Sequence, residues 1–246
     1  MSEVQNELCV AGVDGAAGGW MVIIRHLGTP YTHEAHLVGS FSEILTRWPQ
    51  LQRIAIDMPI GLPDHIGQNG RGPEKAVRPL LGMRQSTVFS IPSRAAVYAE
   101  DYWEACKVAQ ATSAPPKKVS KQAFNIFPKI RELDAAMSPE LESCIFEVHP
   151  EVAFWRLNGE EPIVAPKRVK GQPSGAGLDV RRDLLCNYGY SAHFLDQKAS
   201  KGAARDDLID AAVNAVIAER LLLGQAQPFP ANYERDSNGL RMAIWA

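Results

Sequence analysis

The sequence predicts an α/β protein whose mixed sheet is flanked by helices. Two short apolar runs, at 8–13 and 54–56, are partly β-branched and bounded by Gly or Pro, which is typical of buried strands. Each run ends at an aspartate, Asp14 or Asp57. A later segment, 203–223, has the small and apolar residues of a helix that packs closely on a sheet.

The first 57 residues predict the order β-β-β-α-β. A glycine-rich turn at 15–19 separates the first strand from an apolar run at 20–24, which indicates a hairpin. Residues 33–38 predict a third strand, and a capping-box pattern begins a short helix at 40–48. The strand at 54–56 follows. This order favours a mixed sheet with helical crossovers over an all-parallel one.

Residues 58–140 predict a mainly helical cap, inserted after the fourth strand into a single domain that spans 1–246. Pro and Gly are frequent early in this segment. Its later parts, especially 93–110 and 121–136, have the pattern of helices.

After the cap, we expect a fifth strand at 144–148, a helix at 151–157 and a loop at 160–177 that leads into a further helix. The helix at 203–223 follows, and the tail at 239–245 suggests a terminal strand. The expected loop and its surroundings contain four basic side chains: Lys167, Arg168, Lys170 and Arg181.

The composition excludes several classes of protein. A net charge of -2 argues against a generic binder of polyanions, and 46% hydrophobic with 22% charged residues is ordinary for a globular chain. The four cysteines form no C-x-x-C pair, so a zinc ribbon is not expected. We find no signal-peptide pattern and no membrane-spanning stretch, and we therefore expect a cytoplasmic protein without a membrane partner.

Aspartates at three places suggest a site for Mg²⁺ or Mn²⁺. A carboxylate at the mouth of a buried strand is costly unless a positive charge compensates it. Asp207 and Asp210 share one face of the late helix, where like charges repel unless they are solvated or bind a cation. We expect Asp14, Asp57, Asp207 and Asp210 to bind the metal, because hard oxygen ligands suit these ions.

Simpler interpretations stay open for each of these carboxylates. Asp14 has the sequence context of a turn residue, and Asp57 that of a loop carboxylate. The cluster that begins at Asp206 is also typical of helix capping.

Further candidates lie around the fifth strand and in the cap. Glu147 is a candidate catalytic residue, as a fourth ligand or a substrate contact, and His149 is a candidate acid or base or a structural end-cap. The cap is rich in Lys and Arg, which would suit a phosphate-bearing substrate, although a solvated helical face explains the charges equally well. The candidate substrate-binding residues are Arg71, Arg78, Arg84, Arg94, Lys121 and His149.

Several motifs together resemble a known family, number 429 among domains of unknown function. The motifs occur in order over nearly the whole chain: 12–15 with 19–20, 56–63, 88–94, 147–151, 206–212 and 239–242. A departure from the family's usual pattern is Ser90 after Phe89, where a proline is common.

The resemblance implies a predicted nuclease with an RNase H-like fold. In that superfamily an aspartate ends the first strand, an acidic residue ends the fourth, and aspartates on a late helix complete the set. These positions match Asp14, Asp57, Asp207 and Asp210 here, whereas Glu147 has no secure counterpart.

The leading hypothesis is therefore a metal-dependent nuclease or phosphodiesterase acting on nucleic acid or a phosphorylated small molecule. An actin-like ATP-dependent phosphotransferase is the second, because such proteins also place an aspartate and a glycine-rich hairpin at the first strand. A non-catalytic protein that binds nucleic acid or a partner is the third.

Overall fold

The computed structural model describes residues 8–169 and 172–246, which form two compact units. The first unit contains the chain up to Asp57 together with Ala165–Ala226. The second contains Met58–Val164 and Gln227–Ala246. The predicted insertion thus begins at the boundary between units, but the second unit also includes the fifth strand and the C-terminal tail. That the whole chain is a single domain stays a prediction.

The first unit is built on a mixed sheet. Its strands are β1 (Cys9–Ala16), β2 (Gly19–His26), β3 (Thr32–Val38) and β4 (Ile54–Ile56), in the spatial order β3-β2-β1-β4. β1 pairs antiparallel with β2 and parallel with β4, and β2 pairs antiparallel with β3. This arrangement confirms the predicted mixed α/β class with the order β-β-β-α-β, and it is consistent with an RNase H-like fold.

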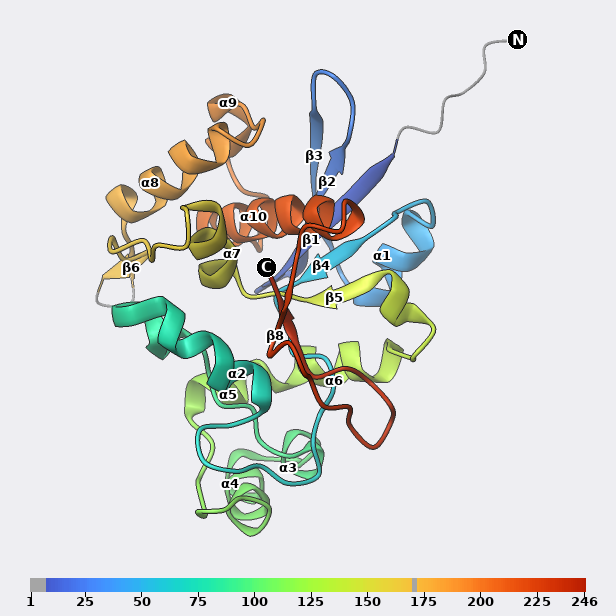
Figure 1. The fold of residues 1–246 in the computed structure, drawn as a ribbon, viewed down its shortest axis with the longest axis vertical. Coiled ribbons are helices and arrows are strands. Elements are labelled where there is room, and N and C mark those ends of the chain that lie inside the picture. The colour runs from blue at the N-terminus through green and yellow to red at the C-terminus, as the bar shows by residue number, and fades with distance from the viewer. Residues whose placement is uncertain (1–7, 170–171) are drawn as a thin grey trace. The chain divides into compact units, whose positions relative to one another are not determined.

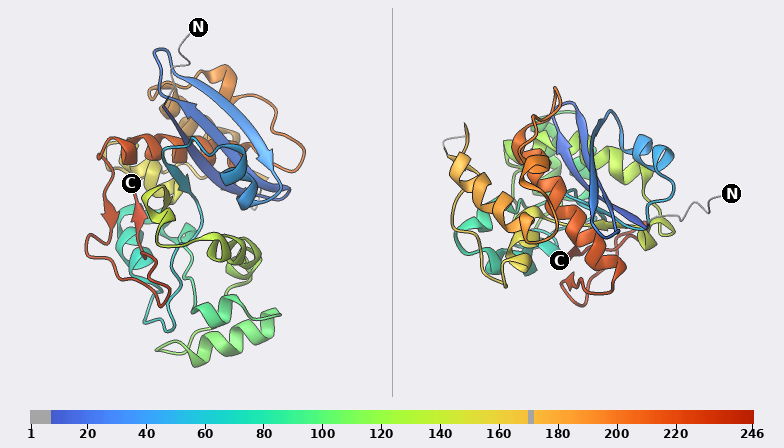
Figure 2. Two further views of the ribbon diagram at one scale, coloured as in Figure 1. Left: turned by 90° about the vertical axis from the view of Figure 1, so that its right-hand side faces the viewer. Right: turned by 90° about the horizontal axis from the view of Figure 1, so that it is seen from above.

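Helices cover both faces of this sheet. In Figure 2, α10 (Arg205–Leu222) and α1 (Phe41–Arg47) lie on opposite sides of it. Gly12 lets α10 approach β1 closely, since a β-carbon added there would lie 2.0 Å from the carbonyl oxygen of Ala211. The unit also contains the helices α8 (Gly175–Cys186) and α9 (Ala192–Leu195) and the short strands β6 (Arg168–Val169) and β7 (Gln172–Pro173), which pair antiparallel.

The start of α1 follows the sequence signal with one difference. The Ser40 hydroxyl accepts a hydrogen bond from the Glu43 backbone N–H at 3.3 Å, as the capping-box pattern predicts. The Glu43 carboxylate accepts from the backbone N–H of Gly39 at 3.1 Å, one residue before the expected donor.

The second unit is mainly helical, as predicted for the insertion (Figure 1). Its α-helices are α2 (Gly72–Val77), α3 (Arg94–Val97), α4 (Tyr102–Ala111), α5 (Lys121–Asn125), α6 (Phe127–Ala136) and α7 (Pro150–Leu157). Two 3-10 helices are η1 (Arg78–Thr87) and η2 (Leu141–Ser143). Its strands are β5 (Ile145–Glu147), β8 (Pro228–Phe229) and β9 (Ile244–Trp245). An apolar cluster that includes Val77, Leu81 and Trp155 forms part of its core.

Two expected helices are each divided in two. The segment 93–110 breaks between α3 and α4 because Asp101 caps a new helix, accepting from the backbone N–H groups of Trp103 and Glu104. The segment 121–136 breaks before α6, where Pro128 occupies the first turn and has no N–H to donate to α5.

The expected terminal strand at 239–245 is reduced to β9. The carboxylate of Asp236 accepts hydrogen bonds from the backbone N–H groups of Asn238 and Leu240. These bonds hold the residues before β9 in a turn. Gly239 has a positive φ of 80° in this turn, a conformation that glycine adopts without strain. β9 instead pairs antiparallel with β8.

No helix among the described residues combines the length and apolar character that a membrane span requires.

Candidate functional site

The ends of β1 and β4 meet α10 at one carbonyl group. In the parallel pair Val13 lies opposite Ile56, so that Asp14 and Asp57 follow at the same edge of the sheet. The carbonyl oxygen of Val13 accepts the backbone N–H of Asp57 at 2.9 Å and the side-chain amide Nδ2 of Asn214 at 3.0 Å. This junction joins the three elements that carry the four predicted ligand positions.

Asp14 is buried among other carboxylates. It is 8% exposed, and its Oδ1 accepts the backbone N–H of Gly15 at 2.9 Å. Burial raises the pKa of Asp14 well above its usual value, and the nearby charges of Asp57, Asp210 and Asp207 raise that pKa further. The structure therefore brings the four predicted metal ligands into one electrostatic cluster, which we call the acidic cluster.

The first two turns of α10 supply the helical part of the acidic cluster. Asp210 is 7% exposed, and Asp207 is half-buried. One oxygen of Asp207, Oδ2, accepts the backbone N–H of Ala204 at 2.8 Å, so that the capping interpretation is confirmed for this side chain. Burial raises the pKa of Asp207, and the Ala204 N–H opposes this shift. Capping by one oxygen and a site role are compatible, because a carboxylate has two acceptor oxygens.

Two basic side chains contact the acidic end of α10. Nζ of Lys167 donates to Oδ2 of Asp210. Nε and Nη2 of Arg168 lie 2.8 and 2.7 Å from Oδ2 of Asp206. Neither residue was predicted to belong to the site. No local pattern near Lys167 and Arg168 could have linked them to Asp210 and Asp206, since the two contacts span 43 and 38 positions of the chain.

The acidic cluster fits a divalent cation in donor type and in charge. The ligands of the ion would be carboxylate oxygens. Asp206 precedes Asp207 in the chain, and its Oδ1 is buried without a hydrogen-bond partner among the described residues. At the same time, no three His, Cys, Asp or Glu side chains within 8–169 and 172–246 already stand in metal-binding geometry. Lys167 and Arg168 provide positive charge there instead.

Glu147 lies in a buried ion-pair network of the second unit. Its Oε1 is 2.6 Å from Nη2 of Arg71, and its Oε2 accepts the backbone N–H of Ile60 at 2.8 Å. Arg71 also contacts Glu74 at 2.6 Å. Burial disfavours the charge of Arg71, but Glu147 and Glu74 hold the pKa of Arg71 above its usual value. A catalytic role for Glu147 stays a prediction.

The predicted substrate-binding arginines are largely occupied inside the second unit. Arg71 is 3% exposed and engages Glu74, Glu147 and two carbonyl groups, which indicates a structural role. Arg78 donates to the carbonyl of Val88 and to the hydroxyl of Ser90. The remaining two arginines are also engaged: Arg84 with the carbonyl of Val164, and Arg94 with Asp134 and Asp236.

The other two candidates differ in exposure. Lys121 is exposed, with its ammonium 5.6 Å from the ring centre of Tyr102. His149 precedes α7 as its N-cap residue, and its Nε2 lies 3.4 Å from the carbonyl oxygen of Thr87. The position of His149 agrees with the end-cap interpretation, but its side chain forms no capping hydrogen bond with the described residues of α7. For all six residues, contact with a substrate stays a prediction.

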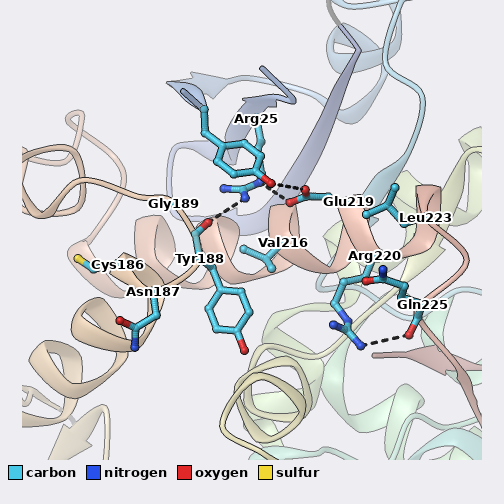
Figure 3. Close-up of a pocket in the computed structure, with 11 residues that line it drawn as sticks. Arg25, Cys186, Asn187, Tyr188, Gly189, Val216, Glu219, Arg220, Leu223 and Gln225 are labelled. Atoms are coloured by element: carbon cyan, nitrogen blue, oxygen red, sulfur yellow. Dashed lines mark hydrogen bonds and ion pairs between the residues drawn. The ribbon is translucent and has the colours of Figure 1, made fainter. Parts of the chain in front are cut away.

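A cavity of about 580 Å³ lies in the first unit near the C-terminal end of α10 (Figure 3). Arg25 forms part of its lining, donating to Glu219 at 2.8 Å and to the carbonyl of Tyr188 at 2.8 Å. Glu219 is about 18 Å from Asp207 along the helix, at 1.5 Å per residue. Because Arg25 and Glu219 pair with each other, this cavity is a weaker candidate for the functional site than the acidic cluster.

The glycine-rich turn after β1 forms a tight hairpin, as predicted. The backbone N–H of Gly18 donates to the carbonyl of Gly202 at 2.7 Å, and a β-carbon at Gly18 would lie 3.0 Å from Cα of Gly202. The turn therefore packs against the chain, which does not favour a phosphate-binding hairpin.

Comparison with known proteins gives one match. A family model described as "Protein of unknown function (DUF429)" matches residues 12–235. Searches of curated proteins and of solved structures found no match.

Proposed function

The chain belongs to the DUF429 family, and we propose that it is a divalent-metal-dependent phosphodiesterase of the nuclease class. The observation that supports this most directly is the burial of Asp14 at the end of β1, next to the charges of Asp57, Asp207 and Asp210. Buried like charges cost folding free energy, and a fold retains them most readily where a cation binds.

The four proposed ligands come from three parts of the first unit: β1, the residue after β4, and α10. Asp14 lies within β1 opposite Met21 of β2, and Asp57 follows directly after β4, so both backbones are held by the sheet. Asp207 lies in the first turn of α10 and Asp210 in the second, three residues apart and on one face. A bound Mg²⁺ or Mn²⁺ would polarise a phosphoryl oxygen and lower the pKa of a coordinated water.

We propose nucleic acid as the substrate, with a phosphorylated small molecule as the narrower alternative. The RNase H-like strand order of the first unit supports a nuclease by analogy of fold. Three exposed lysines of the second unit, Lys117, Lys118 and Lys121, would suit contacts with a phosphate backbone. We do not favour the ATP-dependent phosphotransferase, because the turn at Gly18 packs against Gly202.

The test is cleavage of end-labelled single-stranded, duplex and branched DNA and RNA by the full chain with Mn²⁺ or Mg²⁺. A model phosphodiester, bis(p-nitrophenyl) phosphate, covers the small-molecule alternative. We expect metal-dependent cleavage, reduced in Asp14→Asn and in Asp57→Asn by about a hundredfold or more, since even residues that orient a ligand change activity by about 10- to 100-fold.

The matched control is Asp196→Asn, which removes one carboxylate of the same unit from a side chain paired with Arg182 and Arg205. This variant should retain full activity. Equal cleavage by the wild type and by Asp14→Asn would rule out the proposed site, as would cleavage that continues after chelation of all divalent ions.

A further inference from the structure

Lys167 and Arg168 each form an ion pair with a different carboxylate of α10. Lys167 bonds Asp210, which belongs to the proposed ligand set, whereas Arg168 bonds Asp206, which does not. The side chain of Lys167 is 18% exposed and that of Arg168 is 54% exposed. The two neighbouring cations are therefore alike in charge but differ in which oxygen they occupy.

Buried groups hold the backbone that carries Lys167. Arg181, with 0% exposure, donates from Nη1 to the carbonyl of Ala165 at 2.8 Å. Gly177 of α8 approaches so closely that a β-carbon there would lie 1.9 Å from the carbonyl oxygen of Pro166. The backbone N–H of Ser174 donates to the carbonyl of Lys167 at 2.7 Å. The backbone from which Lys167 reaches Asp210 is thus held by the fold.

From this geometry we propose that Lys167 is a tethered competitor of the divalent cation, occupying the Asp210 oxygen that the ion would otherwise bind. The inference rests on the proposed function, because it takes the acidic cluster as the metal site. An ammonium group and a divalent cation compete for one carboxylate oxygen and repel each other electrostatically. Binding of the ion at Oδ2 of Asp210 therefore requires Lys167 to leave that oxygen.

The competition sets the metal affinity of the cluster. In the absence of metal, the Lys167 ammonium compensates part of the negative charge around Asp14, which lies close enough for Lys167 to act on it. Each ion that binds must also break the charge-assisted hydrogen bond between Lys167 and Asp210. Removing Lys167 should consequently strengthen metal binding, although it deletes a contact of the folded protein.

The experiment measures Mn²⁺ affinity of the full chain from the EPR signal of free Mn²⁺, without substrate. We expect Lys167→Gln to bind Mn²⁺ about tenfold more tightly than wild type, the change that corresponds to one charge-assisted hydrogen bond. Arg168→Gln removes an equal charge nearby but frees no proposed ligand, so its effect should be clearly smaller. Lys198→Gln removes the charge of an exposed residue and should bind like wild type.

A second measurement guards against misfolding of the variant. Thermal unfolding in EDTA should show a lower Tm for Lys167→Gln, and saturating Mn²⁺ should raise that Tm by more than it raises the wild-type Tm. Lys167→Met, which keeps an unbranched apolar stem, should behave in the same way.

The outcomes separate the two proposals. If Mn²⁺ binding requires Asp14 but Lys167→Gln binds no more tightly than Arg168→Gln, the competition is refuted and the metal site stands. If neither the wild type nor Lys167→Gln binds Mn²⁺, or if binding does not depend on Asp14 and Asp210, both proposals fail.

Discussion

The side-chain amide of Asn214 donates to the backbone carbonyl of Val13 at 3.0 Å, which joins α10 to β1 one residue before Asp14. Asn214 is completely buried on a helix whose other buried residues are mostly small or apolar. The same carbonyl accepts the backbone N–H of Asp57. This polar contact, together with the packing of Gly12 against the backbone of α10, holds the helix that carries Asp207 and Asp210 beside β1.

Asn214→Ala should lower the free energy of unfolding by about 1–3 kcal/mol, because it removes a buried hydrogen bond and leaves a small void. Urea unfolding measures this change. Asn187→Ala, at an exposed position of the same unit, should change stability by less than about 0.5 kcal/mol. A similar stability for both variants would show that the Asn214 contact is not important for the fold.

Gly12→Ala should destabilise the protein by about 3 kcal/mol or more, because the new methyl group would meet the backbone of α10 at 2.0 Å and the strand cannot move away without losing its pairing. Gly175→Ala is the matched control, since a β-carbon there meets nothing within 4 Å at the start of α8. The difference in Tm between these two variants checks the prediction. A fully stable Gly12→Ala protein would contradict the close approach of α10 and β1.

Asp14→Asn should stabilise the folded protein at neutral pH while it removes metal binding. Burial and the neighbouring carboxylates raise the pKa of Asp14 in the folded state, so the folded state binds more protons than the unfolded state as pH rises above the usual carboxyl pKa. The wild-type protein therefore loses stability as pH rises through that window, whereas an uncharged asparagine at position 14 avoids the loss. Urea unfolding without metal should show the gain at pH 7 and almost none at pH 3. A variant less stable than wild type at pH 7 would contradict this account.

His33 should make the protein less stable in mild acid. Burial, together with the charge of Arg25, lowers the pKa of His33 to about 4, and Nη1 of Arg25 lies 2.9 Å from Nε2 of the ring. The unfolded state therefore binds more protons than the folded state between about pH 6.5 and pH 4, and stability falls as pH decreases through this window.

For a half-buried ring, this loss should amount to about 1–2 kcal/mol after allowance for solvent screening. His33→Gln should remove most of the difference in unfolding free energy between pH 7 and pH 4.5. The control is His193→Gln, at an exposed position on α9, which should leave the pH dependence unchanged. An unchanged pH dependence in His33→Gln would assign the effect to other groups.

Much of the first unit could be predicted from the sequence because its signals are local. The apolar runs that end at Asp14 and Asp57 became β1 and β4, and the pattern that begins at Ser40 became α1. Strand and helix periodicity depend on neighbouring residues, so they can be recognised without knowledge of the fold. The grouping of Asp14 with Asp57 was predicted from their shared place after apolar runs, and the parallel pairing of β1 with β4 supplies the adjacency that this pattern alone does not give.

Contacts between charged side chains could not be predicted in this way. The ion pairs of Arg71 with Glu74 and Glu147 inside the second unit were not predicted, and contact of Arg71 with a substrate stays a prediction. Lys167 lies in a loop, as expected, but its contact with Asp210 could not be recognised from the residues around it. The basic residue Lys170 of the same segment lies outside the described residues.

Local periodicity and residue type predicted β1 to β5, the segments that form the longer helices, and the residues that can act as hard ligands. Which cation compensates which carboxylate depends on tertiary contacts. A long basic side chain can reach partners several ångströms away in any direction, and the partner that it meets depends on packing between segments far apart in the chain.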